Sequence, residues 1–235
     1  AYESKTRILR DSEDHPALLD TLPEFNYQLA LYGAALIHYR ARFTARLAEY
    51  SAANHSECSG GRETLSLRYE TVKTVEDPFA SQQEIFDALC RHQAEHAHAE
   101  RASRLCLSGP HKDDIEVLLG GVSARSYSSQ GQTRTAALAM KLAEREIYKN
   151  VIGEYPVLLL DDVLSELDPR RQEFVLNRIG GRCLLPAARM TGWSVCSAER
   201  FFIFTAEKLS DWNFPGKGAV LYVYFDRSEW RDPLR

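Results

Sequence analysis

A short apolar run that ends in two acidic residues constrains the fold of this chain more than any other feature. Residues 155–162 have the sequence YPVLLLDD, so apolar side chains stand directly before Asp161 and Asp162. Such a run indicates a buried strand, and carboxylates at its end are costly unless they bind something. Ligands of open α/β sheets bind at the carboxyl ends of strands. We therefore predict an α/β sheet in which Asp161 holds Mg²⁺ and Asp162 polarises an attacking water.

The run alone also allows a simpler interpretation, in which the strand leads into a turn and Asp162 caps a helix. Residues 163–168 follow with the sequence VLSELD. Asp168 and Pro169 form a typical N-cap and first-turn pair, which predicts a helix from Pro169 to about residue 179.

A second helix start lies about 30 residues upstream, where residues 128–132 have the sequence SSQGQ. Ser129 and Gln132 have the spacing of a capping box, which predicts a helix to about residue 149. Gly131 keeps the backbone accessible, and a helix start with free amides and a hydroxyl can bind an anion. An ordinary capped helix is the simpler alternative.

Residues 22–50 show the clearest helical periodicity in the chain. Large apolar residues recur every three or four positions, which predicts a long helix with one apolar face. The other face carries Arg40, Arg42 and Arg46. A solvated basic face on a helix packed against a partner helix is the simpler interpretation, and an arm that contacts DNA phosphates is the alternative. The apolar positions are Phe25, Leu29, Tyr32, Leu36, Tyr39, Phe43, Leu47 and Tyr50.

The remaining pattern predicts two lobes. Residues 1–104 form a helical lobe with a small sheet, and residues 105–235 form an α/β lobe in which 181–200 has no clear period. The other predicted elements are a turn at 59–61, a strand around 65–69, a helix over 81–104, a hairpin of strands near 115–119 and 122–127, and a strand at 201–205.

Bulk composition limits the classes of function. A net charge of −4, with 44% hydrophobic and 26% charged residues, is ordinary for a globular chain and excludes a strongly basic nucleic-acid coat. No apolar run approaches the roughly 20 residues that span a bilayer. Five scattered cysteines without CxxC spacing argue against a disulfide framework. We therefore expect no membrane association and a reducing, cytoplasmic environment.

A rival motif lies at residues 92–96, which have the sequence HQAEH. The H-x-x-E-H pattern occurs in zinc proteases, so a zinc hydrolase that uses His92 and His96 is an alternative function. Because residues 91–104 are polar all round, an exposed helix is the simpler interpretation.

The order of these motifs resembles an ATPase family. SSQGQ, a helix and then LLLDDVLSELD are similar to the signature, Walker B and D-loop of the SMC-like ABC ATPases, and SQGQ followed by Arg134 and Thr135 resembles the RecF family. GPHKDD at 109–114 and SGGRETLSLRYE at 59–70 add to the resemblance, which covers about residues 5–180. It implies a partial ABC-type ATPase head with a helical arm lobe.

The resemblance also implies roles for individual residues in an ATP-dependent, head-to-head homodimer. Ser129, Gly131 and Gln132 would contact ATP bound to the other subunit, Asp161 would hold Mg²⁺, and Asp162 would be the catalytic residue. Ser165 and Asp168 would lie on the D-loop at the dimer seam, and Thr205 would be a switch residue.

The implied function is RecF-like DNA replication and repair in the cytoplasm, near the nucleoid. It includes binding of single-stranded and gapped DNA, the SOS response, and partners of the RecR and RecO type. The chain contains no G-x-x-x-x-G-K-[ST] phosphate-binding loop, which we expect in a preceding segment. We also expect 181–200 to be a divergent insertion. A non-hydrolysing relic that binds DNA or a partner remains the alternative.

Overall fold

The computed structural model describes residues 1–160, 168–178, 183–186, 201–204 and 220–223. The chain forms two compact units, and neither is a continuous stretch of sequence. Unit 1 comprises Ala1–Arg46 and Leu67–Leu118, and unit 2 comprises Leu47–Ser66 and Leu119–Arg235. The lobe boundary predicted after residue 104 stays a prediction. None of the helices in these described ranges has the length and apolarity that a membrane span requires.

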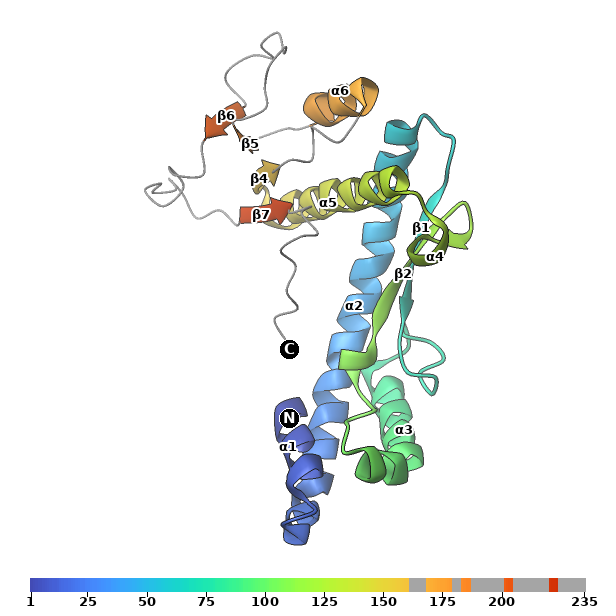
Figure 1. Cartoon of the computed structure of the whole chain (residues 1–235), viewed down its shortest axis with the longest axis vertical. Helices are drawn as coiled ribbons and strands as arrows, with labels where there is room; N and C mark the ends of the chain where they lie inside the picture. The colour runs from blue at the N-terminus through green and yellow to red at the C-terminus, as the bar shows by residue number, and fades with distance from the viewer. Residues whose placement is uncertain (161–167, 179–182, 187–200, 205–219, 224–235) are drawn as a thin grey trace. The chain divides into compact units, whose positions relative to one another are not determined.

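The elements follow one another along the chain as drawn in Figure 1. The helices are α1 (Tyr2–Asp11), α2 (Leu22–Ser59), α3 (Gln82–Ser103), α4 (Ala124–Tyr127), α5 (Gln130–Ile152) and α6 (Pro169–Arg178), with 3₁₀ turns η1 (Pro16–Thr21) and η2 (Pro110–Lys112). The strands are β1 (Leu65–Glu70), β2 (Asp114–Leu119), β3 (Val122–Ser123), β4 (Val157–Leu160), β5 (Cys183–Pro186), β6 (Phe201–Phe204) and β7 (Val220–Val223).

The long helix predicted over 22–50 is confirmed, and α2 continues to Ser59. The predicted packing of this helix on a partner helix is confirmed, but the large apolar residues in the middle of its predicted apolar face are exposed. α2 instead buries a row of small residues and one isoleucine, which form a core with Ile85 and Leu89 of α3. Small side chains let two helices approach closely, so they form the packing face. The α2 residues of that core are Ala30, Ala34 and Ile37, Ala41 is buried one turn further along, and the exposed residues of the predicted apolar face are Tyr32, Leu36, Tyr39 and Phe43.

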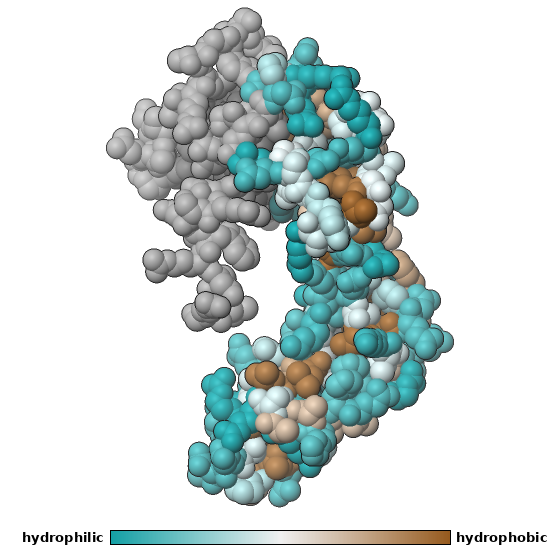
Figure 2. Space-filling view, turned by 45° about the vertical axis from the view of Figure 1, so that its right-hand side comes forward, coloured by the Kyte–Doolittle hydropathy of each residue, from teal (hydrophilic) through white to brown (hydrophobic). Residues whose placement is uncertain are grey.

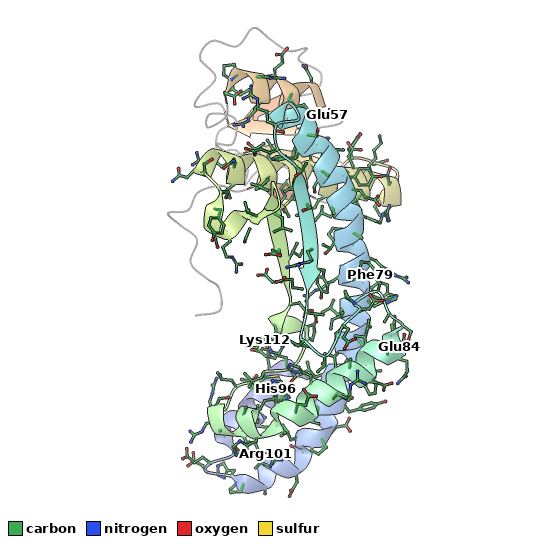
Figure 3. All side chains as sticks on the ribbon, turned by 90° about the vertical axis from the view of Figure 1, so that its right-hand side faces the viewer. Glu57, Phe79, Glu84, His96, Arg101 and Lys112 are labelled. Atoms are coloured by element: carbon green, nitrogen blue, oxygen red, sulfur yellow. The ribbon has the colours of Figure 1, made fainter. Side chains whose placement is uncertain are left out.

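Helix α3 begins at a cap that its own sequence supplies. Ser81 is the N-cap, and its side chain and that of Glu84 form a capping box. Figure 3 shows Glu84 and Phe79 near this end of α3, with His96 further along the helix. The prediction that residues 91–104 form an exposed polar helix is wrong in part, because His92, Gln93 and Glu100 are buried.

The polar groups that α3 buries have partners in unit 1. The Gln93 side-chain amide donates to the backbone oxygen of Asn26 at 3.0 Å. Glu100 forms a 2.7 Å ion pair with Lys5 of α1. Buried polar groups are tolerated when they are paired, so a polar sequence does not by itself mark an exposed helix.

The hairpin predicted at Gly120-Gly121 is confirmed, since both glycines have positive φ and join β2 to β3. The second strand is much shorter than predicted, however. β3 ends at Ser123, and residues 124–127 form the short helix α4. Strands β1, β2 and β3 form a three-stranded sheet in that order.

Unit 2 contains a parallel four-stranded sheet with the order β6-β5-β4-β7. β4 occupies the predicted residues and pairs with both β5 and β7. The sequence did not predict β5 or β7. β5 lies in the part of the chain without a clear period, and four-residue strands carry too little pattern to be recognised alone.

Candidate functional site

The candidate nucleotide site is built around the start of α5, and the predicted capping box is present there. The Gln132 backbone N–H donates to Ser129 Oγ at 3.3 Å, and the Ser129 backbone N–H donates to Gln132 Oε1 at 2.8 Å. Ser129 and Gly131 are both exposed. Because Ser129 Oγ accepts a hydrogen bond from the helix, its own O–H remains able to donate to a ligand.

Gly131 has open space around it among the described residues of unit 2. Of these residues, a Cβ at this position would meet only the Arg171 guanidinium, at 4.0 Å, which is an ordinary van der Waals contact. Neither the backbone conformation nor packing against the described residues therefore requires glycine here. A close approach by a molecule outside the chain is a physical reason for the missing side chain.

The Gln132 side chain is engaged at both ends. Its oxygen accepts the Ser129 backbone N–H, and its nitrogen donates to Glu63 Oε1 at 2.6 Å. Glu63 follows the Gly60-Gly61 turn that ends α2, where the Gly61 N–H donates to the Ser56 oxygen at 2.8 Å. The end of α2 thereby fixes the start of α5. Contact between Gln132 and a nucleotide stays a prediction.

Asp168 caps α6 as predicted. Its Oδ1 accepts the Arg171 backbone N–H at 3.1 Å, and its Oδ2 lies 3.3 Å from Arg171 Nη1. The same guanidinium is the group nearest to Gly131, so the start of α6 and the start of α5 are neighbours in unit 2. Asp168 is exposed. Its predicted place at a dimer seam is not tested by these contacts.

Buried ionisable groups lie behind this surface. His55 on α2 is fully buried, and burial lowers its pKa below the ordinary 6.5, with the neighbouring Glu63 opposing part of the shift. Burial raises the pKa of the Cys58 thiol. At neutral pH burial therefore favours the uncharged forms of this imidazole and this thiol.

The far end of α5 is tied to the start of β4 through Tyr155. Arg145 and Lys149 of α5 each lie 4.3 Å from the centre of the Tyr155 ring. Lys149 Nζ also donates to the Tyr155 hydroxyl at 2.9 Å. Gly153 ends α5 in the left-handed conformation, so the chain turns directly into β4.

All four strands of the unit 2 sheet are parallel, so β4 ends at the edge where ligands of such sheets bind. The predicted residues that follow β4 and β6 lie outside the described residues. They are Asp161, Asp162, Ser165 and Thr205.

The three arginines predicted as DNA contacts differ in their surroundings. Arg40 donates to the Pro110 oxygen at 2.8 Å and lies 3.6 Å from the buried Asp113 carboxylate. Arg42 and Arg46 are exposed and have no ion pair within the described part of unit 1. Contact of these residues with DNA stays a prediction.

The H-x-x-E-H motif has a structural use in α3. His92 Nδ1 lies 2.6 Å from the buried Ser108 Oγ, and the rings of His92 and His96 stack with centroids 3.9 Å apart. Burial lowers the pKa of His92. Among the residues that the structure describes, no three His, Cys, Asp or Glu side chains are grouped to hold a metal. This geometry does not favour the zinc alternative.

Comparison with known proteins shows that the chain is similar to curated proteins named RecF. The chain is 43% identical over 173 residues to the DNA replication and repair protein RecF of Synechococcus sp. (strain JA-3-3Ab), covering 72% of the chain and 46% of that protein. It is 42% identical over 171 residues to RecF of Bacillus subtilis (strain 168), covering 70% and 44%. No family model matches the chain.

Solved structures give the same result. Two structures of the recombination mediator protein RecF in the RecFOR pathway, RecF-ATP and RecF-ATPrS, each match with a TM-score of 0.68 and 30% identity. Each match covers 87% of this chain and 50% of the solved one.

Fold and comparisons together define a class, part of a head with an ABC-ATPase-like fold and a helical arm lobe. Within that class the chain is a RecF homologue. It spans about half the length of the curated relatives that it matches.

Proposed function

We propose that this chain is the signature-bearing part of a RecF-type ATPase that acts in DNA replication and repair. The exposed start of α5, where Ser129 and Gln132 form a complete capping box and Gly131 lies between them, is the observation that carries the proposal. The ATP named in two solved relatives supports a nucleotide as the ligand. The relatives' names support the role in replication and repair.

In this proposal two copies enclose one ATP between them. The Ser129 O–H and the backbone N–H of Gly131 would donate to the γ-phosphate held by the other copy. The partial positive charge at the start of α5 favours the phosphate there. Donors fixed in advance by a capping box need no reorganisation when negative charge develops during phosphoryl transfer.

The carboxylates after β4 would supply the remaining chemistry. Asp161 would hold Mg²⁺, whose role is to offset phosphate charge, and Asp162 would orient and deprotonate the attacking water. Ser165 and Asp168 would line the dimer seam and Thr205 would sense the nucleotide. The phosphate-binding loop is not in the 235 residues and would come from another segment.

The biological setting that we propose is that of RecF in recombinational repair. The proposed assembly binds single-stranded or gapped DNA, acts with RecO- and RecR-type partners, and takes part in the SOS response in the cytoplasm. The RecFOR pathway of the solved relatives supports these partners.

The test is Gly131→Ala in the full chain, mixed with a RecF segment that carries the phosphate-binding loop. The added methyl group meets little among the described residues, and alanine in a helix adds stability of about 0.4–1 kcal/mol. Dimerisation and ATP hydrolysis should still fall, because the methyl group would occupy the space that the γ-phosphate approaches. We expect a decrease of about 100-fold, the size of the effect of losing one transition-state donor. Ser129→Ala is the companion variant.

Two results would count against the proposal. The first is full hydrolysis by the Gly131→Ala mixture, since it would show that no phosphate approaches α5. The second is micromolar binding of Mg-ATP by the chain alone, because the missing loop would then be unnecessary.

A further inference from the structure

Unit 1 exposes a row of large apolar side chains on α2, here named the α2 stripe and defined as Tyr32, Leu36, Tyr39 and Phe43. Their exposed fractions are 67%, 40%, 66% and 43%. The spacing of four, three and four residues places them on one side of the helix. Figure 2 shows hydrophobic side chains at the surface of the described part of the molecule, among mostly hydrophilic ones.

The fold of unit 1 does not use this stripe. α2 packs on α3 through the opposite side, where Ala34 and Ile37 are buried with Ile85 and Leu89. Exposed large apolar side chains scattered singly need no explanation, but a continuous row indicates an interaction surface. Leu29 and Leu47, at the two ends of the row, are buried, so the exposed part is limited to about three helical turns.

The charged side chains on the segment of α2 that carries the stripe are all basic. Residues 25–48 contain no aspartate or glutamate, and they carry three arginines. Arg40 is engaged with Pro110 and Asp113. Arg42 and Arg46 are exposed on the helix surface next to Tyr39 and Phe43, and neither has an ion pair within the ranges described.

We propose that the α2 stripe docks an amphipathic helix of a partner protein that carries acidic residues along its apolar face. The four-three-four spacing is the pattern by which two helices pack side by side. Acidic residues on the partner would meet Arg42 and Arg46, which supplies the charge complementarity. The stripe lies in unit 1, so the inference goes beyond the nucleotide site proposed in unit 2.

A nucleic-acid strand is the competing occupant, because aromatic residues beside arginines can stack bases. The stripe favours a helix for two reasons. Leu36, in its middle, has no ring on which a base can stack. Arg42 and Arg46 lie along one edge, whereas an open groove for a strand needs positive charge along the whole backbone path.

The experiment measures fluorescence anisotropy of labelled probes on the full chain. The first probe is a synthetic 18-residue helix with leucines at four-three-four spacing and flanking glutamates. The second carries lysine in place of each glutamate, and the third is a 20-nucleotide dT strand. We expect the glutamate helix to bind and the other two to bind at least about tenfold more weakly, a difference of 1.4 kcal/mol.

Two variants connect binding to the stripe. Leu36→Ser with Tyr39→Ser should weaken the glutamate helix by about tenfold or more, since central apolar contacts dominate helix docking. Arg42→Glu with Arg46→Glu should reverse the preference and favour the lysine helix. The matched controls are Val151→Ser, an exposed apolar residue of α5, and Lys73→Glu, an exposed basic residue of unit 1. Both should leave binding unchanged.

Three outcomes would overturn the proposal. One is tight dT binding that Tyr39→Ser abolishes, which would make the stripe a nucleic-acid platform. Another is self-association in sedimentation that Leu36→Ser abolishes, which would make a second copy the occupant. The third is failure of the charge-reversed chain to change its preference between the two helices.

Discussion

The buried ion pair between α1 and α3 allows a quantitative test of how unit 1 is held together. Lys5 Nζ lies 2.7 Å from Glu100 Oε2, and the side chains are 0% and 2% exposed. The other oxygen of Glu100 accepts the backbone N–H groups of Leu107 and Ser108 at 2.7 and 3.2 Å. One carboxylate therefore joins two helices and fixes the segment that follows α3.

The loss of unfolding free energy in each variant depends on which buried charge is left without its partner. Lys5→Met leaves the buried Glu100 carboxylate without its cation, which should cost about 3–5 kcal/mol of unfolding free energy. Glu100→Gln leaves the Lys5 ammonium alone at a similar cost, although its carbonyl still accepts both amides. The double variant removes both charges and keeps the acceptor, so it should cost only about 1 kcal/mol.

The assay is urea unfolding of the full chain followed by far-ultraviolet circular dichroism. Hydrogen exchange of residues 1–11 would show that α1 is the element released. Glu13→Gln is the control, because its ion pair with Arg104 is exposed and should contribute less than about 1 kcal/mol. A double variant that loses the sum of the two single losses would refute the coupling of the charges.

Two further predictions concern unit 2. Glu63→Ala should destabilise the start of α5 by about 1 kcal/mol and speed hydrogen exchange at residues 129–133. Glu63→Gln keeps an acceptor for Gln132 and should not, so equal exchange rates in the two variants would contradict the prediction. The lowered pKa of His55 means that stability is present above pH 6.5 and is lost as pH falls below it. Exchange at residues 50–59, corrected for intrinsic rates, should therefore rise between pH 7.5 and 5.5, and His55→Leu should flatten that rise.

The helix ends and strand β4 were predictable because their signals in the sequence are local. Ser129 with Gln132, Asp168 with Pro169, and the Gly60-Gly61 turn each lie within a few residues, and the structure confirms these capping and turn geometries. β4 was predictable because its apolar run is bounded by Pro156 on one side and acidic residues on the other.

The buried side of α2 was not predictable from periodicity alone. Both faces of the helix carry apolar residues, and hydrophobicity favours the side with tyrosine, leucine and phenylalanine. The structure buries Ala30 and Ala34 instead, because small side chains allow α2 and α3 to pack closely. The burial of Glu100 was missed for a related reason, since its partner Lys5 lies 95 residues away in sequence and no local pattern connects them.

The contact between Glu63 and Gln132 is a feature of the site that the sequence alone could not predict. The two residues lie 69 positions apart, and each has a sufficient local role without the other, Glu63 in a turn after α2 and Gln132 in a capping box. Only the fold shows that the turn which ends the long helix also holds the Gln132 side chain at the start of α5. A change that shortens or lengthens the Gly60-Gly61 turn should therefore act on the start of α5 while leaving the capping box sequence intact.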